Sequence, residues 1–84
     1  KNMLILDFVS ECWIELYMNE KLVVAQNFEK DDQFIKEIAM PFKIIIENAD
    51  SVTGTYNDER IDFITNANRL TRLNTIYFLN EQLD

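Results

Sequence analysis

The fold is decided by the stretch Phe42-Lys43-Ile44-Ile45-Ile46, which holds three isoleucines in succession. Branching at Cβ restricts the χ1 angle, and such side chains pack best on a pleated, buried surface. The stretch therefore predicts a strand that lies centrally in a sheet. Pro41 directly precedes it, and a proline is tolerated at a strand end or a sheet edge, where its missing amide donor costs little.

Other segments of the chain repeat the strand pattern, with apolar side chains at every second position. They cover residues 3–9, 12–18, 22–25, 51–56, 61–63 and 73–79. In the second of them, one face would carry Cys12, Ile14, Leu16 and Met18, and the other Trp13, Glu15 and Tyr17. The polar break at residues 19–21 is typical of a hairpin, so the strands before and after it should pair antiparallel.

Residues 34–40 fit two structures. Phe34, Ile35, Ile38 and Ala39 would line one face of a short helix that is capped by Asp31 or Asp32 and ends before Pro41. Isolated short helices are marginal, however, and the neighbouring segments resemble strands. We therefore favour a fourth strand for Phe34 to Met40.

Polar breaks recur every eight to twelve residues, and no segment has the pattern of a crossover helix. This spacing predicts an all-β fold, an antiparallel β-sandwich (Ig-like or similar) of seven to eight short strands. With 84 residues, of which 48% are hydrophobic, the chain suffices for one domain over residues 1–84.

Composition excludes several classes of function. A net charge of −7 repels phosphate backbones and anionic headgroups, which argues against binding to nucleic acid or a membrane surface. The chain has no histidine and one glycine, so it lacks the commonest general base and metal ligand and cannot form a glycine-rich phosphate loop. We expect no enzyme activity, no metal site and no cofactor. No apolar stretch approaches the roughly 20 residues of a membrane span.

Few side chains suggest a site. The acid pairs Asp31/Asp32 and Asp58/Glu59 lie in predicted turns, where carboxylates are usually hydrated. Arg69 and Arg72 would more often pair with the surplus acids than hold a ligand carboxylate. Cys12 lies in an apolar run, so we expect a buried free thiol.

The aromatic side chains allow an alternative function. Trp13, Tyr17, Tyr56 and Tyr77 would suit a sugar or a peptide if they formed one exposed face. Burial is the commoner fate, so we expect Trp13 in the core and the tyrosines with one wet edge. A carbohydrate-binding module would need Trp13, Tyr17 or Tyr77 exposed in a row.

Five short motifs follow one another along the chain: Leu4 to Phe8, Glu11 to Leu16, Pro41 to Ile46, Asn48-Ala49 and Val52 to Asn57. Together they resemble the C-terminal extracytoplasmic domain of the RodZ family, and the resemblance runs from about Leu4 to Leu79. The motif positions, to which the resemblance gives structural roles, are Cys12, Trp13, Glu15, Pro41, Phe42, Asn48, Ala49, Tyr56 and Asn57. Glu47 and Asp58 stand where the family usually has glycine, and the Ala-Gly turn expected near Asp31 is absent. Asparagine and aspartate tolerate positive φ best among other residues, so the fold should survive these departures.

The resemblance implies a non-catalytic interaction domain on the periplasmic side of the bacterial inner membrane. Its partners there would be cell-wall elongation proteins or peptidoglycan. The parent would be a single-span membrane protein with a cytoplasmic helix-turn-helix domain that contacts the actin-like MreB. Because the chain begins at Lys1 and not at methionine, we expect a fragment of such a parent, with the span outside this chain.

Overall fold

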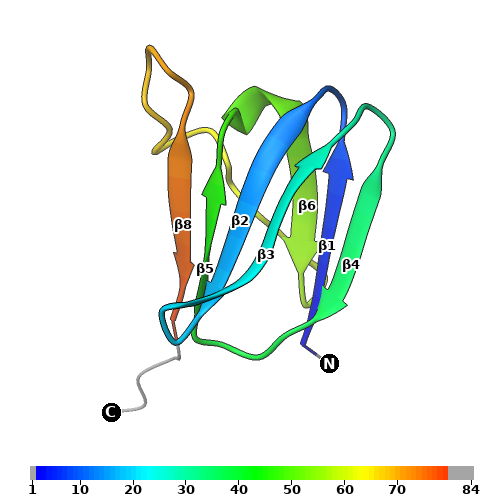
Figure 1. Cartoon of the computed structure of the whole chain (residues 1–84), viewed down its shortest axis with the longest axis vertical. Helices are drawn as coiled ribbons and strands as arrows, with labels where there is room; N and C mark the ends of the chain where they lie inside the picture. The colour runs from blue at the N-terminus through cyan, green and yellow to red at the C-terminus, as the bar shows by residue number, and fades with distance from the viewer. Residues whose placement is uncertain (1, 80–84) are drawn as a thin grey trace.

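The computed structural model describes residues 2–79, which form two four-stranded antiparallel sheets packed face to face (Figure 1). The elements are β1 (Met3–Phe8), β2 (Cys12–Met18), β3 (Lys21–Phe28), β4 (Gln33–Glu37), β5 (Phe42–Ile46), the short 3-10 helix η1 (Ala49–Ser51), β6 (Val52–Tyr56), β7 (Glu59–Arg60) and β8 (Asn74–Phe78). One sheet has the order β4-β1-β6-β7 and the other β3-β2-β5-β8. The predicted all-β sandwich is confirmed.

Strand β5 lies centrally in its sheet, as its isoleucines predict, and pairs with β2 on one side and β8 on the other. Ile44 stands opposite Leu16 of β2 and Ile76 of β8, and its side chain is 0% exposed. Alternate β-branched residues therefore close the inner face of this sheet, as expected for a buried strand.

The core fills the space between the two inner faces. Leu4, Leu6 and Phe8 come from β1, and Ile14, Leu16, Ile44 and Ile46 come from β2 and β5. Tyr56 belongs to this core, being 7% exposed, and its hydroxyl donates to the Ile38 carbonyl oxygen at 2.7 Å. The wet edge expected for this tyrosine is wrong, because the hydroxyl finds a buried backbone acceptor instead of water.

Residues in the left-handed backbone conformation form the tight turns. Asn19 and Glu20 (φ 50° and 65°) join β2 to β3, and Asn57 and Asp58 (φ 52° and 69°) join β6 to β7. Two consecutive positive φ values give the turn whose twist suits a two-residue hairpin. Asp31, at φ 73°, takes the same conformation between β3 and β4. Asp58 thus adopts, without glycine, the backbone that the resemblance requires.

The ambiguous segment after Asp32 is a strand. β4 pairs with β1 along its length, with Phe34 opposite Leu6 and Ile35 opposite Ile5. Phe34 packs against the core, whereas Ile35 is 56% exposed, so the alternation of a half-buried strand replaces the helical face.

The strand expected at residues 61–63 is wrong. The Asp62 carboxylate accepts hydrogen bonds from the backbone N–H groups of Ile64 and Thr65, both at 3.0 Å. Such a local side-chain bond offers the backbone an alternative to a sheet ladder, so the chain turns and β7 ends at Arg60. Phe63 is nevertheless buried in the core.

Candidate functional site

Trp13 lies on the outer face of the β3-β2-β5-β8 sheet, and the expectation that it is buried is wrong. Its neighbours Cys12 and Ile14 point into the core, so the alternation of the strand turns Trp13 outward, where it is 37% exposed. The prediction for Cys12 is confirmed: its side chain is buried, and this burial raises the pKa of the thiol.

A carboxylate joins two of the aromatic side chains on this face. Glu15 accepts hydrogen bonds from Trp13 Nε1 and from the Tyr17 hydroxyl, both at 2.8 Å. These donors hold the pKa of Glu15 below its ordinary value, whereas donating to Glu15 raises the pKa of Tyr17. The hydrogen bonds fix the orientations of both rings.

Lys43 connects Tyr17 to a third aromatic ring. In the register of the sheet, Lys43 of β5 lies opposite Tyr17 of β2 and opposite Tyr77 of β8. The Lys43 Nζ is 5.0 Å from the centroid of the Tyr17 ring and 6.0 Å from that of the Tyr77 ring, within the range of a cation–π contact. We call Trp13, Glu15, Tyr17, Lys43 and Tyr77 the aromatic face.

A hollow of about 300 Å³ opens where the aromatic face meets the β2–β3 turn. It is lined by Tyr17, Asn19, Glu20, Pro41, Phe42, Lys43, Tyr77 and Leu79. Tyr77 and Leu79, which are 62% and 66% exposed, leave this hollow open to solvent. It therefore combines apolar walls with a few polar groups, as ligand sites usually do.

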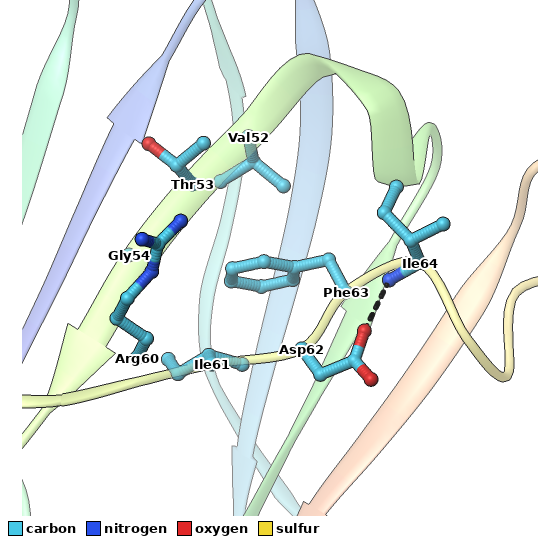
Figure 2. A pocket seen from close by; sticks show the side chains of 8 residues that line it. All are labelled: Val52, Thr53, Gly54, Arg60, Ile61, Asp62, Phe63 and Ile64. Atoms are coloured by element: carbon cyan, nitrogen blue, oxygen red, sulfur yellow. Dashed lines mark hydrogen bonds between the residues drawn. The ribbon is translucent and has the colours of Figure 1, made fainter.

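A second hollow, of about 360 Å³, lies beside β6 (Figure 2). Its two charged side chains diverge: Arg60 extends over Gly54, whereas the Asp62 carboxylate turns toward the backbone N–H of Ile64. Because the charges do not meet at a common point, this hollow is the weaker candidate for a ligand.

The other sequence-predicted residues lie in turns and loops. Asp32 accepts a hydrogen bond from the Glu29 N–H at 2.7 Å, and Asp58 forms the β6–β7 turn while Glu59 starts β7. Arg72 forms two hydrogen bonds to Asp50, of 2.8 and 3.0 Å, which hold the pKa of Asp50 below its ordinary value. Within residues 2–79, no group of three or more potential ligands could hold a metal ion.

The motif residues mostly support the backbone. Cys12, Trp13 and Glu15 lie on β2, and Pro41 and Phe42 lie at the start of β5. Asn48 caps η1 by accepting from the Asp50 N–H at 3.0 Å, and Ala49 beside it is buried. Asn57 accepts from the Met3 N–H at 2.9 Å and so joins the β6–β7 turn to β1. The sequence indicated the aromatic residues Trp13, Tyr17 and Tyr77 as a possible exposed face, but no pattern in it indicated that Lys43 lies between the tyrosines.

The environment of Glu15 leads to a testable prediction. We expect its carboxyl to titrate below the ordinary glutamate value of about 4.3, because two hydrogen bonds stabilise the charged form. The stability that these bonds provide should be present above that ordinary value and disappear as the pH falls through the folded-state pKa. Carboxyl-detected NMR titration measures this pKa. The Trp13→Phe variant, which lacks the indole donor, should raise it; an unperturbed value in the parent chain would contradict the geometry.

These features define the class of protein: a small antiparallel β-sandwich with one exposed aromatic face and a buried inner core. Comparison with known families narrows the class further. The family model for the RodZ C-terminal domain matches residues 6–74, and the chain belongs to this family. No curated protein and no solved structure gives a significant match. Among the residues described, no helix has the length and hydropathy needed to span a membrane.

Proposed function

We propose that this domain is the non-catalytic, periplasmic interaction domain of a RodZ-like cell-shape protein. In this proposal its parent links the MreB cytoskeleton inside the cell to the peptidoglycan elongation machinery outside. Membership of the RodZ C-terminal domain family supports the assignment to a cell-shape protein. Two observations support a binding role in preference to catalysis. The chain has no histidine, and the Glu15 carboxylate on the aromatic face already accepts hydrogen bonds from two neighbouring side chains.

The aromatic face is the observation that carries this proposal. Tryptophan and tyrosine are enriched at the centres of protein interfaces because they offer a large contact area for few rotatable bonds. Here the hydrogen bonds to Glu15 hold Trp13 and Tyr17 in place before any partner arrives. Little side-chain freedom is then lost on binding, which favours affinity.

A carbohydrate-binding module is the second candidate function, and the exposure of two rings favours it. Trp13 and Tyr77 lie on one face of the same sheet and are 37% and 62% exposed. Tyr56 takes no part, because it is buried between the sheets. A glycan is therefore a candidate for the contact itself, beside the elongation proteins.

Site-specific photocrosslinking in the full-length parent tests where and what the domain binds. A photoreactive amino acid at position 13 or 77 should crosslink to elongation proteins or to peptidoglycan, since both positions lie on the aromatic face. The matched control is position 53, which is exposed on strand β6 of the other sheet, and it should give no such product. Equal products from position 53 would count against this surface.

A fusion of alkaline phosphatase to the C-terminus of the parent tests the location independently. A periplasmic domain should give an active phosphatase, because that enzyme needs an oxidising compartment for its disulfides. An inactive phosphatase, together with a fluorescent protein that is bright at the same position, would place the domain in the cytoplasm and refute the proposal.

A further inference from the structure

The Lys43 ammonium has an unusual environment for a lysine in so acidic a protein. The chain has 15 acidic residues, yet among residues 2–79 the one salt bridge joins Arg72 to Asp50. Lys43 therefore forms no salt bridge with a described carboxylate. Its side chain is half-buried and its Nζ lies near two tyrosine rings. A positive charge is therefore held at one wall of a hollow without a salt bridge to any of the described carboxylates, although Glu20 lines the same hollow.

The walls of the hollow suit a ring-shaped ligand. Tyr77 and Leu79 expose apolar surface, and Asn19 and Glu20, which also line the hollow, carry hydrogen-bonding groups. Aromatic surface flanked by a few polar groups matches the two sides of a pyranose ring, which has apolar C–H faces and a rim of hydroxyl groups. The volume of about 300 Å³ admits one sugar residue of a longer chain.

The charges around the hollow limit how acidic the ligand can be. Lys43 attracts one anionic group, whereas Glu20 beside it and the net charge of −7 oppose a dense polyanion such as a nucleic acid. A sugar with a single carboxylate fits this charge distribution. Lys43 can pair with its one negative charge, and a single charge is repelled less by the acidic protein than a polyanion is.

The aromatic face extends beyond the hollow. Trp13 lies four residues from Tyr17 on the same strand, or about 13 Å along β2. Tyr77 lies two strands from Tyr17, about 10 Å away. Both separations are longer than one sugar ring. A single sugar therefore cannot span the aromatic face, but a glycan of several sugars can contact the hollow and Trp13 together.

We propose that the hollow beside Lys43 binds a carboxylate-bearing sugar of a glycan strand, with the ring against Tyr77 and the carboxylate at the Lys43 ammonium. The biological part of this inference rests on the proposed function, because a periplasmic domain meets peptidoglycan, whose strands contain N-acetylmuramic acid. The lactyl carboxylate of this amino sugar is free where the stem peptide has been removed from the strand, and such stretches are the ligand proposed here. The binding chemistry itself does not depend on that location.

NMR titration of the 84-residue chain with two matched disaccharides tests the proposal. The first carries N-acetylmuramic acid, and the second, N,N′-diacetylchitobiose, has the same N-acetylated pyranose rings without the lactyl carboxylate. We expect backbone shifts around Tyr17, Lys43 and Tyr77, and tighter binding of the first sugar. Absence of shifts at millimolar sugar, or equal affinity for both sugars, would overturn the proposal.

Two variants separate the roles of the charge and the ring. Lys43→Met keeps the apolar stem and should weaken binding of the muramic disaccharide about tenfold to a hundredfold, since a hydrogen bond to a charged group is worth about 1.5–3 kcal/mol. Binding of N,N′-diacetylchitobiose should stay unchanged. Tyr77→Ala should abolish binding of both, and Thr53→Ala on the other sheet should change neither. Dispersed spectra must show that each variant is folded; a Lys43→Met variant that keeps the preference for the acidic sugar would overturn the role of Lys43.

The outcomes also distinguish this inference from the proposed function. A chain that binds the sugar although its parent places it in the cytoplasm would refute the proposed function and leave the sugar site intact. A periplasmic domain that crosslinks from position 77 to elongation proteins but shows no sugar-dependent shifts would refute the sugar site and support the proposed function.

Discussion

Replacing Ile44 by alanine is expected to lower the free energy of unfolding by about 2–5 kcal/mol. Ile44 is 0% exposed and lies in register between Leu16 and Ile76 of the two flanking strands. Because both neighbours are held by their own sheet hydrogen bonds, the cavity left by the substitution can collapse only in part. A small domain has a total stability of about 5–15 kcal/mol, so the loss would be a large fraction of it.

The next residue provides the matched control. Ile45 has the same side chain on the same strand but points to the outer face, where it is only half-buried. Ile45→Ala should therefore cost clearly less than Ile44→Ala. Urea unfolding followed by circular dichroism measures both values, and equal losses would contradict the assignment of the two faces.

Replacing Gly54 by alanine is expected to destabilise the chain by about 1–3 kcal/mol, and by valine more. A Cβ atom at Gly54 would overlap the backbone oxygen of Ile5 on the neighbouring strand and lie 2.9 Å from Leu6 Cδ2. Since the Ile5 oxygen is a backbone atom, relief requires β1 and β6 to move apart. Gly54 does not have a positive φ, so this cost arises from the close approach of the strands and not from the backbone conformation.

The expected change in stability of the Gly54→Ala variant is opposite in sign to the change at an ordinary strand glycine. A glycine replaced at an ordinary strand position normally gains stability, because alanine restricts the unfolded chain. Thermal unfolding of Gly54→Ala should instead show a lower midpoint, while Thr53→Ala, at the exposed neighbouring position, should show little change. A stabilised Gly54→Ala variant would contradict the close packing of β1 against β6.

The apolar alternation was sufficient to predict the fold, since each strand of a sandwich must turn every second side chain inward. Ile44 and Ile46 of β5 follow this rule, and so do Leu4 and Leu6 of β1. The same rule places Trp13 outside, because Cys12 and Ile14 face the core. The expectation of a buried tryptophan gave too much weight to its apolar neighbours along the chain and too little to the face on which it lies.

The segment between β7 and β8 was harder to predict, because local polar bonds decide its course. Asp62 binds the backbone ahead of it, and Asn68 accepts hydrogen bonds from the N–H groups of Leu70 and Thr71, both at 2.8 Å. These contacts override the period-two pattern at Ile61 and Phe63. Periodicity describes only how a segment meets the core, so it carries no information on such turns.

The aromatic face was only partly predictable for a different reason. Tyr17, Lys43 and Tyr77 come from three strands that are distant in sequence, and their contact depends on the register of β2, β5 and β8. A single sequence predicts which side chains share a strand face, but strand order and register are properties of the assembled sheet. The lysine between the rings therefore became visible only in three dimensions.

The pairing of β8 with β5 sets a practical boundary for anyone who trims this domain. The family match ends at residue 74, where β8 begins. A protein cut there would keep only Asn74 of β8, so most of the edge of the isoleucine strand β5 on that side would be open to solvent. Unprotected apolar edges recruit strands from other molecules, so the shortened protein would tend to aggregate even though every matched residue is present.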